Sequence, residues 1–463
     1  MVSAGTSGGI PVAAGASGGP TSGAAGGAAG ATASAAGSGG PPAAGSGGPG
    51  TSTEPDPGAA PVCTAKTPDE FELNARIGGG SGSSEQSAHF AVYSSSSADT
   101  ILNFMEAAHK CFIDDWCFRT PSLSVDDDEG GPYYKLNIYS TGAIGAGGLT
   151  HWDAGAKLSY IQVLSSQAAD PRTTVHEYGH AITMSEFNWI EQKRTGYWWE
   201  TVANWVSYSF LLSPYCKSAR DEFGIKEATT ILDQMRTLET VYGQSYKVIC
   251  NDQNYYQAWP FLTYLTNNPD NYPGLGKLAV QDLMRKYKIG SNETPLHTLD
   301  RNAAPVKAQT IVGRYWARMA YMDIGLPVGQ KDFLARRDSL NYAANLDSSG
   351  SDTYKVKSAR QPQYFGANMT PLQTSGGEVS VTVTPSGGKA TSTLAIMGPN
   401  NTVRYVDLPD GSGSATIGAD EEVTLVVVNT PDELINFDPQ YIRSPENVGL
   451  DYTVKLTGAT PAN

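Results

Sequence analysis

The chain has 463 residues and a formal net charge of −14, from 46 acidic and 32 basic side chains. No cluster of basic residues that could neutralise phosphates is evident, which argues against a nucleic-acid partner. No apolar run reaches the roughly 18 residues of a membrane-spanning helix, so a membrane span is not expected either.

The first 60 residues differ in composition from the rest of the chain. They hold 18 of the 51 glycines, no aromatic residue, and only Glu54 and Asp56 as charged residues. Such a segment buries too little apolar surface to offset the entropy lost on ordering, so residues 1–61 are predicted to be a disordered linker. It would be either a tether to a surface or an inert spacer. No signal peptide is recognisable at the start, and we expect the encoding frame to extend upstream to an export signal.

Residues 62–373 are predicted to form the main folded domain, in which strands are followed by helices. Strands are predicted at 89–93, 135–139 and 158–164, and apolar residues at helical spacing predict a helix at 101–112. Further helices are predicted at 173–184, 198–212, 226–241, 256–265, 275–287, 309–322 and 331–342. A small sheet followed by a helical bundle indicates the α+β class.

Residues 374–463 are predicted to form a C-terminal β-sandwich. β-branched segments separated by turn residues occur at 379–383, 391–397, 403–408, 423–429 and 452–456. The segment contains no Cys, His or Trp, so we expect no catalytic role for it. It is either a binding or stabilising module or a packing appendage.

The motif His176-Glu177-x-x-His180 carries the clearest chemical signal. On a helix, residues four apart lie on one face, so the two imidazoles can bind one Zn²⁺. Glu177 would lie beside a zinc-bound water and could take its proton as the water attacks a carbonyl. The alternative is an exposed helix that happens to carry two histidines.

A catalytic zinc site needs a third protein ligand, and Glu200 is the best candidate. The 20 residues after His180 allow one helix to end, a turn to form, and a second helix to present Glu200 beside the histidines. Asn204, four residues on, would share that face and could hydrogen-bond a ligand histidine. Alternatively, Glu200 is an acid in the first turn of a helix, stabilised by the helix dipole.

These residues resemble the zinc site of the gluzincin metallopeptidases, the thermolysin-like clan, in which a glutamate on the following helix is the third ligand. The wider pattern is similar to an uncharacterised family of secreted gluzincin-like proteins with a C-terminal β-module. That likeness spans residues 70–373, with marks at 87–90, 135–139, 176–180, 199–205 and 364–368. It implies a zincin-like core. The amide of Asn204 replaces the acid that thermolysin-like enzymes usually carry there.

The resemblance also implies that the substrate backbone pairs with an edge strand just before the zinc helix. The candidate is the strand at 158–164, with Ser159, Tyr160 and Ile161 as possible substrate contacts. The glycine-rich segment 142–148 would form the rim of the cleft or an ordinary loop.

The reaction would also need a group that stabilises the oxyanion. His297, Tyr197 and Tyr208 are candidates, and the sequence does not distinguish among them or from Tyr315. For His297, a structural role is the simpler alternative.

The acidic segment 126–129 could bind Ca²⁺, although it lacks EF-hand spacing, and a solvated acidic loop is the alternative.

The five cysteines do not have zinc-finger spacing. We expect two disulfides and one free cysteine, with Cys111–Cys117 and Cys216–Cys250 as the pairs considered. Five reduced thiols are the alternative.

Together these features predict an exported, monomeric zinc metallopeptidase that acts on a protein or peptide substrate. It would be secreted or held at the cell surface by its N-terminal linker. Two other functions fit the same residues. One is a binding or adhesin-like protein that keeps the zinc fold without useful activity, and the other is a zinc hydrolase of a different amide, such as a peptidoglycan crosslink.

Overall fold

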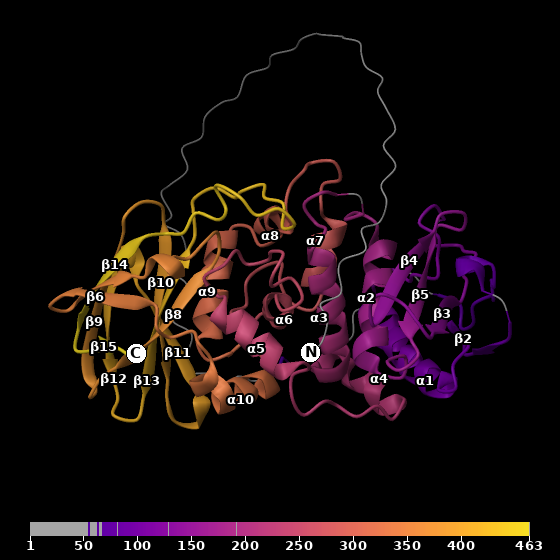
Figure 1. Ribbon diagram of the computed structural model, residues 1–463, viewed down its shortest axis with the longest axis horizontal. Helices are drawn as coiled ribbons and strands as arrows, with labels where there is room; N and C mark the ends of the chain where they lie inside the picture. Colours follow the sequence, from indigo (N-terminus) through magenta and orange to yellow (C-terminus); the bar gives the residue numbers. More distant parts are fainter. Residues whose placement is uncertain are drawn as a thin grey trace, which may run out of the picture. The chain divides into compact units, whose positions relative to one another are not determined.

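The computed structural model describes residues 54–55, 63, 67–80, 82–127, 129–190 and 192–462. Apart from Glu54 and Pro55, the predicted linker lies outside these residues. The described part is a mixed α+β protein with three β-sheets and a set of helices (Figure 1), as the sequence predicts at the level of fold class.

The first sheet has five strands in the order β1-β2-β3-β5-β4. Its strands are β1 (Ser84–Gln86), β2 (Phe90–Tyr93), β3 (Leu136–Thr141), β4 (Gly148–Asp153) and β5 (Leu158–Leu164). β2, β3 and β5 run parallel, whereas β1 and β4 pair antiparallel at the two edges. β5 was expected to be an edge strand, and that expectation is wrong, because β4 folds back along it and takes the edge.

One helix, α1 (Ala98–His109), lies between β2 and β3 in the chain, and the other α-helices follow the first sheet. These are α2 (Pro171–Glu186), α3 (Trp198–Leu212), α4 (Lys217–Glu222), α5 (Gln234–Gly243), α6 (Trp259–Asn267), α7 (Ala279–Arg285), α8 (Pro295–Asn302), α9 (Ala308–Met319) and α10 (Pro327–Arg336). The predicted helix at 226–241 forms only in its second half. Asp233 precedes α5 with a positive φ of 44°, which breaks the helical path at that point.

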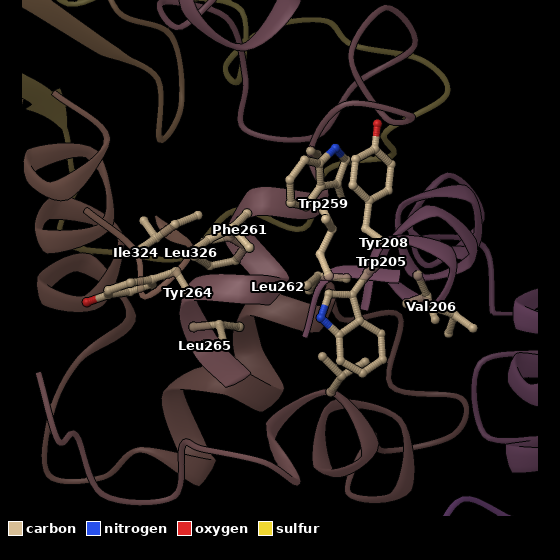
Figure 2. Close-up of a cluster of buried hydrophobic side chains, with 14 of the residues drawn as sticks. Trp205, Val206, Tyr208, Trp259, Phe261, Leu262, Tyr264, Leu265, Ile324 and Leu326 are labelled. Atoms are coloured by element: carbon tan, nitrogen blue, oxygen red, sulfur yellow. The ribbon is translucent and has the colours of Figure 1, made fainter. Parts of the chain in front are cut away.

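α3 is held in place by aromatic packing against α6. Figure 2 shows Trp205 and Tyr208 of α3 beside Trp259 and Leu262 of α6. The Tyr208 and Trp259 rings stack with centroids 4.0 Å apart, and Trp205 is fully buried. Buried aromatic side chains of this size dominate core energetics, so α3 has little freedom to shift.

The C-terminal β-sandwich consists of two five-stranded sheets with a shared apolar core. One sheet has the order β11-β10-β13-β8-β15 and the other β12-β9-β14-β7-β6. The strands are β6 (Leu346–Gly350), β7 (Thr353–Val356), β8 (Ala367–Gln373), β9 (Gly377–Pro385), β10 (Ala390–Met397), β11 (Val403–Asp407), β12 (Ser412–Ile417), β13 (Glu422–Asn429), β14 (Tyr452–Thr457) and β15 (Thr460–Pro461).

The sandwich starts before the expected boundary at residue 374, because β6, β7 and β8 belong to it. Two features hide these strands in the sequence. Four of the five residues of β6 are exposed, so it lacks an apolar stripe. β8 is buried on both faces, so it lacks alternation.

An ion pair and an aromatic residue join the sandwich to α9. Arg314 of α9 pairs with Asp407 of β11 at 2.7 Å. The Tyr405 ring of β11 lies 5.2 Å from the Arg314 guanidinium and 5.0 Å from that of Arg318. The Tyr405 hydroxyl donates to Asp323 Oδ2 at 2.7 Å, and Arg318 pairs with Asp323 at 2.7 Å. The sandwich is therefore fixed to the helical region through buried charges.

The disulfides are Cys63–Cys117 and Cys111–Cys216, and Cys250 is free and buried. Two disulfides with one free cysteine were expected, but both expected pairings are wrong. A π-helical turn at Lys110–Asp115 continues α1, so Cys111 points into the core beside the helix carrying Cys216. Cys117, beyond the turn, reaches Cys63 instead.

Among the described residues, no helix combines the length and the apolar character needed to cross a bilayer.

Candidate metal centre

The two motif histidines lie side by side on α2. Asp170 caps the helix by accepting a hydrogen bond from the Arg172 amide, and Pro171 occupies the first turn, where a missing N–H costs nothing. One turn apart on the same face, the rings of His176 and His180 have centroids 4.9 Å apart. Both side chains are mostly buried, at 13% and 15% exposure.

Glu200 reaches these histidines from the first turn of α3. Its Oε2 lies 3.3 Å from His176 Nε2 and 3.2 Å from His180 Nε2. The two helices approach closely at Gly179, where a Cβ would lie only 2.7 Å from the Cα of Ala203. Glycine at this position thus sets the distance between the helices and brings Glu200 within reach.

The three side chains form a set of ligands around a common point. They offer ligand atoms within 4.8 Å of one another, and this is the one such group of three or more in the described part of the chain. Glu200 Oε2 is buried, and the polar atoms that it faces are the two histidine Nε2 atoms, so its charge has to be balanced there by a proton on a histidine or by a cation. Two imidazoles and a carboxylate are ligands that suit Zn²⁺.

Without a cation, the short distances between Glu200 and the two histidines shift the pKa values of His180 and Glu200. Burial opposes protonation of His180, but the Glu200 carboxylate outweighs it and raises the pKa of His180 to about 9. Burial alone would raise the pKa of Glu200, yet the two histidines bring it far below its usual range. A positive charge is therefore favoured at the point where the three side chains meet.

Asn204 orients His176 as the sequence predicted it could. The Asn204 amide nitrogen donates to the main-chain oxygen of Tyr256, which leaves its Oδ1 to accept from His176 Nδ1 at 2.8 Å. The proton on Nδ1 places the free electron pair of the imidazole on Nε2, which faces Glu200. An amide can fill this role because its nitrogen is held by the main-chain oxygen of Tyr256, which turns the amide oxygen toward the imidazole.

Glu177 extends from α2 toward the edge strand β4 and is 5% exposed. The Thr150 hydroxyl lies 2.8 Å from Glu177 Oε2 and 2.8 Å from the Glu177 main-chain oxygen. Gly148 approaches so closely that a Cβ there would lie 2.6 Å from Glu177 Oε1. Thr150 and Gly148 were not predicted from the sequence, because the packing that brings β4 to α2 is not local.

Tyr256 is a third residue near the site that was not predicted from the sequence. Its ring centroid is 6.0 Å from that of His176, and it begins a stack that continues through Tyr255 to Tyr197. Burial, followed by the charge of Glu200, raises the pKa of Tyr256 far above its usual value, so its hydroxyl stays protonated. The Tyr255-Tyr256 pair just before α6 was the available signal, but 24 tyrosines concealed it.

The predicted oxyanion candidates lie in different places. Tyr197 stacks on Tyr255 with centroids 4.3 Å apart and is the candidate connected to the site. The Tyr208 hydroxyl donates to the main-chain oxygen of Leu232, and the ring packs in the core. His297 caps α8 through Thr294, with Nδ1 3.0 Å from the threonine hydroxyl. These contacts assign structural roles to Tyr208 and His297.

The expected substrate strand also needs correction. Ser159, Tyr160 and Ile161 lie on β5, whose backbone pairs with β3 on one side and β4 on the other. The pairing with β4 runs from Leu158 to Val163 and that with β3 from Ile161 to Leu164, so β5 is an internal strand. The free edge belongs to β4, which begins at Gly148, the last residue of the segment expected to be a cleft rim or an ordinary loop.

The acidic segment considered for Ca²⁺ does not bring its described side chains together. Asp126 forms an ion pair with Lys157, and the main-chain oxygen of Asp127 accepts from Arg119. Glu129 is exposed, and Asp128 lies outside the described residues. Calcium binding stays a prediction.

The chain belongs to a protein family described as a family of unknown function (DUF6055), whose model matches residues 79–463. The matched residues include the first sheet, the helices and the sandwich. A search of curated proteins found no match.

Proposed function

We propose that this protein is an exported zinc-dependent peptidase of the gluzincin type, with a zincin-like core formed by the first sheet and the helices α2 and α3. The observation that carries the proposal is the Glu200 carboxylate. It comes from a second helix to within 3.3 Å of both histidine Nε2 atoms, and its buried Oε2 has no other partner.

The donor set fits a zinc ion that keeps one position open. His176, His180 and Glu200 would hold the metal, and Asn204 fixes the His176 ring through Nδ1. Bound Zn²⁺ would polarise a substrate carbonyl and lower the pKa of water at the site.

Glu177 would move the proton in the hydrolysis of a peptide bond. As the water oxygen bonds to the carbonyl carbon, Glu177 accepts a proton from the water. It passes this proton to the leaving nitrogen as the C–N bond breaks, so that the carboxylate is regenerated. Its placement beside His176 and its 5% exposure keep bulk water away from that transfer.

β4 is the element that would align an extended peptide. Its outer edge carries main-chain donors and acceptors that no other strand of the described chain uses, and it borders Glu177 through Thr150. The half-buried Tyr256, whose ring centroid lies 6.0 Å from that of His176 and whose hydroxyl stays protonated, is a better candidate than Tyr208 or His297 to donate to the developing oxyanion.

Export is supported by the cysteines. The two disulfides join cysteines whose sequence separations are 54 and 105 positions. Disulfides are typical of proteins that fold in an oxidising compartment. The predicted linker at residues 1–61 would then hold the enzyme away from a surface, as a tether.

The test is zinc content together with chelator-sensitive cleavage of a mixed peptide library. The Glu177→Gln variant should retain zinc and lose at least about 100-fold in turnover, because general-base catalysis contributes that much. The His180→Ala variant should lose the metal. Full activity of Glu177→Gln would refute the mechanism, and stoichiometric zinc in His180→Ala would refute the ligand set. Bound zinc with no cleavage would favour a binding protein.

A further inference from the structure

We propose that Thr150 of β4 is a positioning residue for Glu177. Its hydroxyl holds one carboxylate oxygen, Oε2, and leaves the other, Oε1, free to accept a proton. The inference rests on the proposed function, because it assigns how the general base of that site is oriented.

The contacts of the Thr150 hydroxyl support this division. It lies 2.8 Å from Glu177 Oε2 and 2.8 Å from the main-chain oxygen of the same residue. A hydroxyl has one proton to donate, and an ionised carboxylate oxygen is the stronger acceptor of the two. Within the described residues, Glu177 Oε1 has no hydrogen-bond partner, so the two oxygens differ in what they can do.

The strand register explains why Thr150 faces the carboxylate. Side chains alternate along β4, so Gly148, Thr150 and Trp152 share one face. That face is turned to α2, since Ser159, the partner of Trp152 on β5, contacts Met184 Sδ at 3.4 Å. On the same face, two residues before Thr150, the missing side chain of Gly148 makes room for the carboxylate.

Gly148 and Thr150 thus confine the carboxylate from one side. A Cβ at position 148 would lie 2.6 Å from both Cγ and Oε1 of Glu177, so the backbone of β4 at Gly148 packs directly against the carboxylate. In the described part of the chain, the hydroxyl of Thr150 is the one group that contacts the carboxylate through a hydrogen bond. Because β4 is also the free edge of the sheet, the strand that would receive the peptide is the strand that orients the base.

Two substitutions at Thr150 separate the hydrogen bond from the shape of the side chain. Thr150→Val keeps the β-branched shape and removes the hydroxyl, whereas Thr150→Ser keeps the hydroxyl and removes a methyl group. We expect Thr150→Val to lower kcat roughly 10- to 100-fold with little change in KM, the size of a lost hydrogen bond to a charged group. Thr150→Ser should stay within about 3-fold of the wild type, because the charge-assisted bond is retained.

Thr183→Val is the matched control. Thr183 is a buried threonine on α2 whose hydroxyl donates to the main-chain oxygen of Gly179 at 3.0 Å. Removing it deletes a hydroxyl from the same helix without touching the carboxylate. It should leave kcat unchanged, and a loss equal to that of Thr150→Val would show a general packing effect and overturn the proposal.

A binding measurement tests the inference without turnover. Acetohydroxamate chelates zinc and gives its hydroxyl proton to a neighbouring carboxylate, so its affinity for the zinc-loaded protein reports whether Glu177 is held in place. By calorimetry, we expect Glu177→Gln and Thr150→Val each to weaken binding about 10-fold or more, with Thr150→Ser and Thr183→Val close to the wild type.

The outcomes separate the two proposals. If Thr150→Val binds acetohydroxamate like the wild type while Glu177→Gln is weakened, the role of Thr150 is refuted and the proposed function stands. If the wild type cleaves no peptide but the binding pattern appears, the positioning role stands and the peptidase function fails. Equal binding by Glu177→Gln and the wild type would refute both.

Discussion

The close crossing of α2 and α3 at Gly179 offers a direct test of how the candidate metal centre is built. In Gly179→Ala, the new Cβ would lie 2.7 Å from the Ala203 Cα and 3.1 Å from the Val206 Cβ. Since carbon atoms pack at about 3.5–4.0 Å, the helices must separate by roughly 1 Å. Zinc sites tolerate only about 0.2 Å in ligand distance, so Glu200 would be displaced from the histidines by several times that tolerance.

We expect zinc affinity to fall about 10- to 100-fold, comparable to the loss of an outer hydrogen-bond partner of a zinc ligand. The free energy of unfolding should change less, because an overpacking cost of about 1–3 kcal/mol is offset by about 1 kcal/mol of helix propensity gained from alanine. Competition with a chromophoric chelator measures the affinity, and urea unfolding of the metal-free protein measures the stability.

Gly196→Ala is the control for Gly179→Ala. Gly196 lies in the turn before α3, and a Cβ there meets nothing within 4 Å. It should bind zinc like the wild type. If Gly179→Ala also binds zinc like the wild type and is more stable, then the helix crossing does not set the ligand distances and the reasoning is wrong.

Three further predictions concern the rest of the molecule. Tyr405→Phe removes the donor to Asp323 and should lower the free energy of unfolding, measured in urea, by about 1–3 kcal/mol. Tyr441→Phe, at a residue that is 62% exposed, should leave the free energy of unfolding unchanged. Equal effects of the two variants would refute a stabilising role for the buried Tyr405 hydrogen bond. Burial raises the pKa of Asp323 to about 6, so the folded state binds its proton more tightly than the unfolded state does. The stability contributed by this proton is present below the unfolded pKa, near 4, and is lost as the pH rises through 6. The free energy of unfolding of the wild type, compared with that of Asp323→Asn, should therefore decline over this pH range. Parallel curves for the two proteins would contradict this. Finally, an Ellman assay should detect no thiol in the native protein and one, Cys250, after unfolding without reductant; three or more would disprove the disulfide assignment.

Local patterns in the sequence predicted much of the fold and of the candidate metal centre. The period of the apolar residues predicted α3 with the bounds observed, and it predicted the mixed α+β class. The spacing of His176 and His180 places both rings on one helix face wherever that helix packs. Glu200 and Asn204 have the same four-residue relation on the next helix, so each pair could be recognised from the helical repeat alone.

Contacts between distant segments were decided only by the tertiary structure. Which strand forms the free edge depends on how β4 folds back on β5, and the cysteine pairing depends on where the π-helical turn directs Cys111. Thr150 is 27 positions in the sequence from its hydrogen-bond partner Glu177, and Tyr256 is 52 positions from its partner Asn204. The sequence by itself determined which side chains share a helix face, because a helix repeats every 3.6 residues. Only tertiary packing decided what lies opposite that face, because such contacts have no period in the sequence.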